Sequence, residues 1–346
     1  MLVFVCLAAM AAGGAAEVNL QWAQLPPVPD PLGFGGHFSG VSGGALLVAG
    51  GSNFPEKMPW ESGRKAWYDT GYVLERVNGP WRAAFKLPRP LGYGVSVSAP
   101  DGLYCIGGSG AAEHVRDVFR VRRSSTGWQC EAISPLPKPL AYACGALVGK
   151  TIYVTGGTVS PDATVALNEF WALNYRKPGA GWRELEPLPG PGRILAVAAA
   201  VRGDFYVAGG ASLAPDADGK PARTYLKDAY RYSDGKGWVR VADLPSPVVA
   251  APTPAPVVGK DTFLVIGGDD GALVHFEPKS QHPGFPNKIL SYNTRNDQWT
   301  VVSRTPSPRV TTPAVAWKGR IVLSSGEARP GVRSPEVWAA TVKRSR

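Results

Sequence analysis

The stretch of this sequence with the clearest chemical potential is a short turn near its C-terminus. It reads Ser-Gly-Glu-Ala-Arg-Pro-Gly-Val-Arg-Ser over residues 325–334, so Glu327 and Arg333 stand on either side of a Pro-Gly pair. A carboxyl group in such a turn can act as a general acid and base, and a guanidinium can hold an anionic substrate. The same two residues could instead form a structural salt bridge, and the residues alone leave both interpretations open.

Four further cations stand near the starts of predicted strands, one in each of four repeats. They are Arg89, Lys138, Arg193 and Arg309. If these side chains meet at a common axis, they form a cationic mouth suited to a carboxylate. The alternative is that they are solvated basic residues that follow prolines. The choice depends on the elements that position them.

Those elements come from an internal repeat. A short apolar run that ends in a glycine pair occurs five times, and a sixth, degenerate copy is Leu-Ser-Ser-Gly at residues 323–326. The glycine pairs are Gly50-Gly51, Gly107-Gly108, Gly156-Gly157, Gly209-Gly210 and Gly267-Gly268. A second mark, a tryptophan followed by a proline, also occurs six times. Its tryptophans are Trp22, Trp81, Trp128, Trp182, Trp238 and Trp299.

Each repeat predicts four short antiparallel strands, a to d, with the glycine pair at the end of b and the tryptophan on d. A lone four-stranded unit exposes both faces, so six units are expected to close into a ring. The chain begins with a d strand around Trp22 and ends with a c strand over residues 336–342, which together complete one blade. The sequence therefore predicts an all-β, six-bladed kelch-type β-propeller whose last blade is closed by an N-terminal strand.

Links between blades and the loops between strands b and c emerge on one face of such a ring, which makes that face the expected site of function. Three of these loops are long and could roof the central channel: residues 52–68, 211–224 and 269–286.

The chain carries 37 Lys and Arg against 27 Asp and Glu, a net charge of +10. An acidic partner fits that balance, but the basic residues are scattered, so nucleic acid is not an expected partner. No stretch approaches the roughly 20 apolar residues of a membrane span. Residues 1–16 resemble a signal peptide, with an apolar run before Gly-Ala-Ala, so a periplasmic or secreted propeller of residues 17–346 is expected.

The Gly-Glu-Ala-Arg-Pro-Gly-Val-Arg stretch resembles the signature of bacterial kelch propeller mutarotases, the N-acetylneuraminate epimerase group. The likeness is to the branch in which the blade order is cyclically permuted. Three other stretches agree with it: Gly-Gly-Ser-Asn-Phe-Pro at residues 50–55, Pro-Trp-Glu at 59–61 and Gly-Tyr-Gly-Val-Ser at 92–96.

This resemblance implies an isomerase that interconverts the α and β anomers of N-acetylneuraminic acid (sialic acid) by ring opening, without a cofactor or a metal. It implies catalytic roles for Glu327 and Arg333. Arg333 would fix the carboxylate of the sugar, and Arg193 and Arg309 are weaker candidates for that contact.

Other functions fit the sequence less well. A kelch module that binds a glycan or a protein without catalysis remains open, because the fold does not dictate function, and so does a mutarotase of another sugar. A copper oxidase would need clustered histidine ligands, whereas the four histidines are scattered. Glycoside hydrolysis needs two opposed carboxyl groups, and the sequence places only Glu327.

Overall fold

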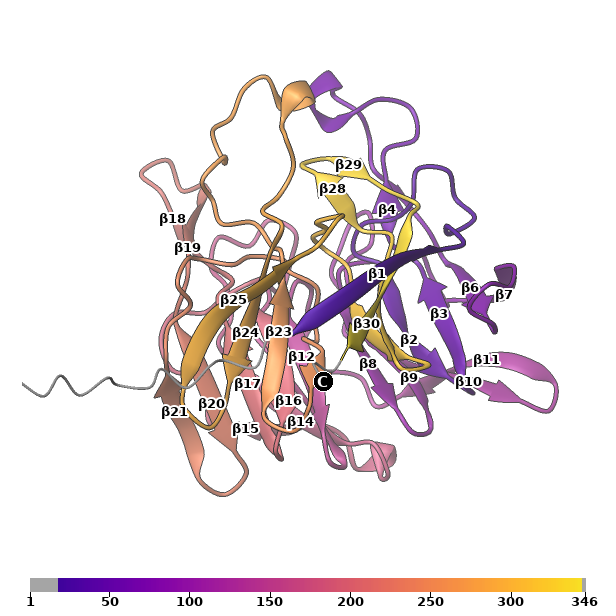
Figure 1. Ribbon diagram of the computed structural model, residues 1–346, viewed down its shortest axis with the longest axis horizontal. Coiled ribbons are helices and arrows are strands. Elements are labelled where there is room, and N and C mark those ends of the chain that lie inside the picture. Colours follow the sequence, from indigo (N-terminus) through magenta and orange to yellow (C-terminus); the bar gives the residue numbers. More distant parts are fainter. Residues whose placement is uncertain (1–17, 344–346) are drawn as a thin grey trace, which may run out of the picture.

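Residues 18–343, which a computed structural model describes, form six antiparallel four-stranded sheets around a central axis (Figure 1). The predicted signal peptide of residues 1–16 lies outside the described residues. The protein is a six-bladed β-propeller, as predicted. Among residues 18–343 there is no α-helix, only three short 3-10 turns, and no helix long and apolar enough to cross a membrane.

The blades follow the order of the repeats. Blade 1 contains β2 (Phe38–Ser42), β3 (Ala45–Ala49), β6 (Thr70–Leu74) and β7 (Arg82–Lys86). Blade 2 contains β8 (Val95–Ala99), β9 (Gly102–Ile106), β10 (Val118–Ser124) and β11 (Gly127–Ile133). Blade 3 contains β12 (Cys144–Val148), β13 (Thr151–Thr155), β14 (Phe170–Asn174) and β15 (Arg183–Leu185).

Blades 4 and 5 are built in the same way, and blade 6 is completed by the first strand of the chain. Blade 4 contains β16 (Val197–Val201), β17 (Asp204–Ala208), β20 (Ala229–Ser233) and β21 (Gly237–Val241). Blade 5 contains β22 (Val257–Val258), β23 (Thr262–Ile266), β24 (Lys288–Asn293) and β25 (Gln298–Arg304). Blade 6 contains β26 (Ala314–Trp317), β27 (Arg320–Ser324), β30 (Val337–Lys343) and β1 (Asn19–Leu25).

The closure of the ring is the pairing of β1 with β30. The two strands are antiparallel in continuous register from Asn19 opposite Lys343 to Leu25 opposite Val337. In Figure 1 the indigo β1 passes in front of the yellow β30. This arrangement pairs the edge that each strand would otherwise expose, and the predicted closure is therefore confirmed.

The hydrophobic core lies between blades rather than within any one of them. Six apolar clusters each combine side chains from two neighbouring blades. For example, one cluster joins Leu46 and Val48 of blade 1 to Val315 and Val322 of blade 6. Because each blade covers the faces of its neighbours, the repeats are stable only as a ring.

The tryptophan mark has a second role besides packing. In four blades the indole nitrogen donates a hydrogen bond of 2.8–3.0 Å to a carbonyl just after strand d of the preceding blade. The donors are Trp81, Trp182, Trp238 and Trp299, and the acceptors are Pro26, Ser134, Glu186 and Ala242. The tryptophans thus join adjacent outer strands, which explains their spacing of one per repeat.

The glycine pairs allow strand b to turn sharply where the link of the next blade crosses it. All five pairs have positive φ at both residues, and the sixth copy keeps this conformation with Ser325 at φ 60° and Gly326 at φ 95°. The strain at Ser325 is offset locally, because its hydroxyl accepts a hydrogen bond from the Phe34 amide at 2.7 Å and donates to the Ser334 carbonyl at 2.7 Å. The degenerate copy is therefore a full structural repeat.

Candidate functional site

The residues after the sixth glycine mark form a small hairpin that stands above blade 6. Strand β28 (Glu327–Arg329) pairs with β29 (Val332–Arg333), and Glu327 lies directly opposite Arg333. The Glu327 Oε2 atom is 3.5 Å from Nη2 of Arg333. The other carboxylate oxygen, Oε1, accepts a hydrogen bond from the amide of Gly331 at 2.8 Å. The structure therefore brings together the two residues that the sequence singled out.

The Arg333 guanidinium is buried but incompletely bonded. Its side chain is 4% exposed, its Nη2 donates to the Tyr93 hydroxyl at 3.0 Å, and it lies 4.9 Å from the ring centre of Phe54. Among the described residues, its Nε and Nη1 atoms have no hydrogen-bond partner. Burial alone would lower the pKa of Arg333, but Glu327 and Tyr93 outweigh it, so the pKa is raised.

A closed ring of backbone hydrogen bonds connects the six links between blades below this hairpin. One residue from each link has a left-handed conformation, with φ between 54° and 67°, and its amide donates to the carbonyl of the equivalent residue in the preceding blade at 2.5–2.9 Å. The six residues, called here the axial ring, are Gly36, Tyr93, Tyr142, Leu195, Ala250 and Thr311. The hydrogen bonds form a closed circle, so these positions are fixed by all six blades at once.

A second set of equivalent positions lies immediately after the glycine pairs. Each of these residues pairs with the link residue just before the axial ring. They are Ser52, Ser109, Thr158, Ala211, Asp269 and Glu327. Asp269 in blade 5 is therefore the repeat equivalent of Glu327 in blade 6, a relationship that alignment of the six glycine marks would have shown.

These positions surround a cavity of about 590 Å³ above the axial ring. Five ionisable groups other than tyrosine line it, and they come from four segments that are far apart in the sequence: Lys65, Arg223, Asp269, and the hairpin that carries Glu327 and Arg333. Aliphatic side chains, including Ile194, Leu213 and Val249, form part of its wall. Charged groups on a partly apolar wall suit a ligand with both an ionised group and hydrocarbon.

Tyr225 and Asp269 form a polar pair in the wall of this cavity. The Tyr225 hydroxyl donates to Oδ2 of Asp269 at 2.9 Å, and the Gly271 amide donates to Oδ1 at 3.0 Å. Burial, followed by the charge of Asp269, raises the pKa of Tyr225 to about 12. This hydroxyl is therefore a neutral donor at ordinary pH.

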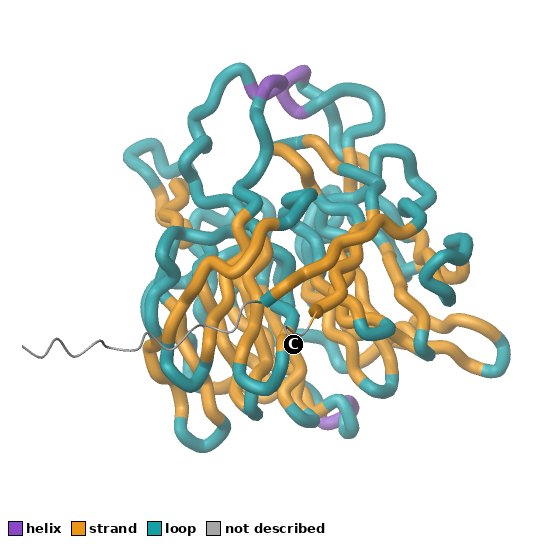
Figure 2. The backbone as a smooth tube through the Cα atoms, viewed as in Figure 1, coloured by secondary structure: helices purple, strands orange, loops and turns teal. Residues whose placement is uncertain are grey.

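Two loops contact the hairpin, one through Pro59 and the other through Ser280. A Cβ atom on Gly331 would lie 2.9 Å from Pro59 Cγ, in the short turn η1 (Pro59–Glu61), and Arg329 Nη1 donates to the Ser280 carbonyl, in η3 (Lys279–Gln281), at 3.1 Å. Figure 2 shows both purple turns above the strands. These turns belong to two of the three loops expected to roof the channel. The third contains the hairpin of β18 (Ala211–Pro215) and β19 (Pro221–Tyr225), which supplies Arg223 and Tyr225.

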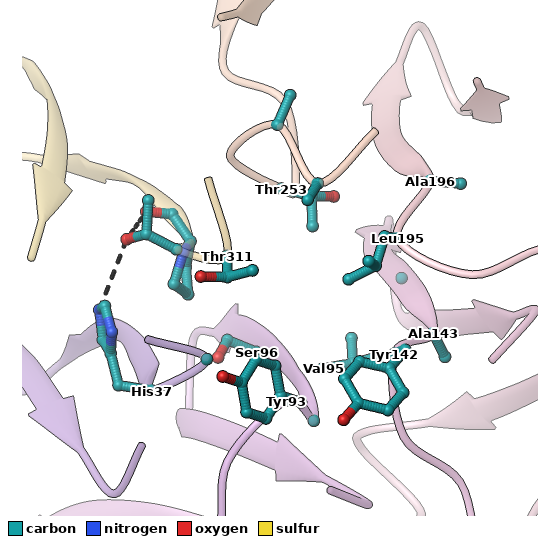
Figure 3. Close-up of a pocket in the computed structure, with 17 residues that line it drawn as sticks. His37, Tyr93, Val95, Ser96, Tyr142, Ala143, Leu195, Ala196, Thr253 and Thr311 are labelled. Carbon is teal, nitrogen blue, oxygen red and sulfur yellow. Dashed lines mark hydrogen bonds between the residues drawn. The ribbon is translucent and has the colours of Figure 1, made fainter. Parts of the chain in front are cut away.

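On the other side of the axial ring, toward the inner strands, lies a smaller cavity of about 60 Å³ (Figure 3). Tyr93 and Tyr142 lie beside each other there, with ring centres 5.1 Å apart. His37 also lines it, and burial lowers the pKa of this histidine to about 4. Five of the six axial ring residues border both cavities, and Gly36 borders the smaller one alone. The ionisable side chains Lys65, Arg223, Asp269, Glu327 and Arg333 line the larger cavity.

The four other cations singled out in the sequence do not line the large cavity. Each pairs with an acid that immediately precedes strand c of its own blade. The pairs are Arg89 with Asp117, Lys138 with Glu169, Arg193 with Asp228, and Arg309 with Glu336. Arg193 and Arg309 stand two residues before the axial ring, and their side chains are directed to these acids. The expected cationic mouth is formed instead by Lys65, Arg223 and Arg333.

Sequence reasoning missed Lys65, Arg223, Tyr93, Tyr142, Tyr225 and Asp269. The tyrosines of the axial ring follow the predicted link cations by a few positions, and Asp269 follows a glycine pair, so a stricter alignment of the repeats would have found them. Lys65 and Arg223 lie in long loops that have no counterpart in the other blades, and no signal in the sequence marks them.

Among residues 18–343, no group of three or more His, Cys, Asp or Glu side chains is arranged to hold a metal ion. Three cysteines, Cys105, Cys130 and Cys144, are free thiols. Burial raises the pKa of Cys144 to about 12, so it is an inert part of the core.

Comparison with curated proteins supports the resemblance drawn from the hairpin. The chain is 45% identical to the N-acetylneuraminate epimerase of Salmonella enteritidis over 108 residues, which are 27% of this chain and 28% of that protein. It is 27% identical to the N-acetylneuraminate epimerase of Haemophilus influenzae over 227 residues, 58% of this chain and 57% of that protein. The matched segments therefore span from about a quarter to just over half of these relatives. No protein-family model matches the chain.

Proposed function

We propose that this protein is a sugar-acid mutarotase that interconverts the α and β anomers of N-acetylneuraminic acid. The observation that carries the proposal is the Glu327–Arg333 pair in the wall of the cavity, where a buried guanidinium has two nitrogens without a partner among the described residues. The similarity to proteins named N-acetylneuraminate epimerase supports the substrate.

The proposed reaction needs one carboxyl group that accepts and returns a proton. Glu327 takes the proton of the anomeric hydroxyl, the carbonyl forms as the bond between the anomeric carbon and the ring oxygen breaks, and the electron pair of that bond goes to the ring oxygen. Glu327 then gives its proton to that oxygen. Ring closure on the opposite face of the carbonyl reverses these steps and restores the carboxylate.

The surrounding residues fit this role. The amide of Gly331 holds one oxygen of Glu327, which leaves Oε2 beside the guanidinium and next to the cavity. Arg333 would bind the carboxylate on the anomeric carbon, which places the anomeric hydroxyl near Glu327. A hydrogen bond between a charged donor and a carboxylate is about twice as strong as a neutral one, which favours an acidic sugar.

The test is anomer exchange followed by one-dimensional NMR on freshly dissolved α-N-acetylneuraminic acid. The wild-type protein should accelerate the exchange, and Glu327→Gln should lose about a hundredfold or more of that acceleration, because the amide cannot accept the proton. Glu113→Gln, which changes an exposed glutamate outside the cavity, is the matched control. No acceleration by folded wild-type protein would refute the assignment, and acceleration that survives Glu327→Gln would assign the proton transfer to another group.

A second reaction is favoured by one observation. Asp269 lines the same cavity as Glu327, so the cavity has two carboxyl groups where the sequence placed one. Two carboxyl groups are the usual requirement for glycoside hydrolysis. Release of 4-nitrophenol from the 4-nitrophenyl α-ketoside of N-acetylneuraminic acid tests this alternative directly. Mutarotation is preferred because Asp269 is already engaged by Tyr225 and Gly271.

Export to the periplasm or the medium is part of the proposal and depends on the pattern of residues 1–16 alone. Cell fractionation of the full-length chain, with sequencing of the N-terminus of the recovered protein, tests both the location and the cleavage after residue 16.

A further inference from the structure

Lys65 is a cation in the cavity that has no carboxylate partner among the described residues. It lies in the loop between η1 and β5 (Ala66–Trp67), and its side chain is half-buried. Its Nζ atom lies 4.8 Å from the ring centre of Tyr93 and 5.2 Å from that of Trp67. An ammonium group held against aromatic faces is attracted to the rings and is partly withdrawn from water.

Tyr93 holds both this lysine and Arg333. The Tyr93 hydroxyl is 3.4 Å from Lys65 Nζ and 3.0 Å from Arg333 Nη2. Both cations can only donate, so the two lone pairs of the hydroxyl are used, and its proton goes to Ser52 Oγ at 3.2 Å. Since Tyr93 belongs to the axial ring, it holds the two cations at a position fixed by the whole propeller.

The two cations have hydrogen-bonding capacity left over. An ammonium group has three donors, and Tyr93 is the one hydrogen-bond acceptor of Lys65 among residues 18–343. Arg333 Nη1 and Nε also have no acceptor in the same set, but both atoms are buried, so Arg333 contributes mainly its positive charge. One carboxylate, Glu327, is within 4 Å of the pair, and it contacts Arg333 at 3.5 Å. Two positive charges that share one neutral hydroxyl attract an anion placed between them.

We propose that Lys65 and Arg333, held by Tyr93, form a two-cation site that binds the carboxylate of the substrate, and that Lys65 selects sugar acids over neutral sugars. This inference rests on the proposed function, because it names the group of the sugar acid that the site recognises. Glu327 acts on the proton, whereas Lys65 acts on binding.

The first test compares Lys65→Met with Lys65→Arg in the anomer-exchange assay. Methionine keeps an unbranched apolar side chain against Tyr93 and Trp67 but removes the charge. We expect Lys65→Met to raise KM about ten- to a hundredfold, with kcat changed by less than about threefold, because a charged hydrogen bond is lost from the ground state and the transition state alike. Lys65→Arg should restore most of the affinity. Lys57→Met, an exposed lysine of the same loop that does not line the cavity, should behave as wild type.

The second test measures binding without turnover and therefore does not depend on catalysis. The methyl α-ketoside of N-acetylneuraminic acid cannot open its ring, and calorimetry gives its dissociation constant. Lys65→Met should weaken that binding about as much as it raises KM. The methyl ester of the same ketoside, which has no ionised carboxylate, should bind weakly to the wild-type protein and equally weakly to Lys65→Met.

The outcomes separate the two proposals. If the wild-type protein accelerates exchange and Lys65→Met leaves both KM and ketoside binding unchanged, the inference about Lys65 is wrong and the function stands. If the wild-type protein binds the ketoside without accelerating exchange, the function fails, and the comparison of acid with ester still decides the role of Lys65. Absence of both binding and acceleration would refute the two together.

Discussion

Buried arginines in this propeller differ in how completely their guanidinium groups are hydrogen-bonded. The side chains of Arg193 and Arg309 are 0% and 7% exposed, and each contacts a carboxylate of its own blade. Arg193 makes two hydrogen bonds to Asp228, at 2.9 and 2.8 Å, and one to the Gly209 carbonyl. Arg333 is equally buried but has two nitrogens without a partner among residues 18–343. Arg193 and Arg309 each leave only Nε without a partner in the same set, so the bonding of the guanidinium, rather than its burial, distinguishes Arg333.

Removing the carboxylate charge beside Arg193 should therefore affect stability and leave activity intact. We expect Asp228→Asn to lower the free energy of unfolding by about 3–5 kcal/mol, because it leaves a buried charge uncompensated. Asp117→Asn, which affects the half-exposed Arg89, should cost about 1 kcal/mol or less. Urea denaturation and exchange kinetics on the same samples measure both quantities. A stable Asp228→Asn protein that has lost activity would place Arg193 in the site after all.

At the scale of elements, the axial ring explains why the hairpin and the loops converge. Every ring residue has a positive φ, yet five of the six are not glycine. The conformation is strained for such residues, and the closed circle of hydrogen bonds maintains it. The strain places side chains such as Tyr93 and Thr311 at the wall of both cavities.

The glycine of this ring should tolerate no side chain. A Cβ atom at Gly36 would lie 2.5 Å from the ring of Tyr93, whereas one at Gly44, with a similar φ in the β2–β3 turn, would meet nothing within 4 Å. We expect Gly44→Ala to cost about 1 kcal/mol from backbone strain alone. Gly36→Ala should cost more and should also raise KM, since Tyr93 must move. Equal losses of stability from the two substitutions, measured by urea denaturation, would contradict this expectation. They would show that the Tyr93 ring moves aside without lowering the free energy of unfolding further.

Much of this arrangement could be predicted from the sequence, because each repeat uses the same residue types at the same structural positions. Glycine pairs and tryptophans marked the strands b and d, and the phase of the marks predicted the closing strand. Those marks do not show which residue of each link reaches the axis. Arg193 and Arg309 were therefore expected there, whereas the structure places them two residues before the axial ring. Lys65 was missed because its loop belongs to one blade, and nothing in a single sequence tells which long loop folds back over the axis.

At the scale of the whole molecule, the seam between blades 6 and 1 contains a buried histidine. His37 is 2% exposed, with Nε2 3.2 Å from Ser324 Oγ of blade 6 and Nδ1 3.3 Å from the Phe34 carbonyl. Burial is the main reason why its pKa falls to about 4. The folded protein therefore keeps this ring neutral, whereas the unfolded chain binds a proton near pH 6.5.

This difference makes the seam sensitive to acid. Because the folded pKa is the lower one, the contribution to stability is fully present above about pH 6.5 and is lost as the pH falls toward 4. We expect His37 to account for about 2 kcal/mol of the stability lost between pH 7.5 and pH 5. His37→Gln should remove that part of the pH dependence in urea denaturation. An unchanged pH dependence in the variant would mean that other groups cause the loss.

The pairing of Asn19 with Lys343 also determines how the molecule responds to force. Both residues lie at the same end of the closing strand pair. A load applied between them would open the hydrogen bonds of β1 and β30 one after another, like a zipper, instead of shearing them all together. The ring should thus open at low force when it is pulled by its ends and resist more strongly when it is pulled from Leu25 against Lys343. Optical-tweezer measurements with handles at these positions would distinguish the two directions.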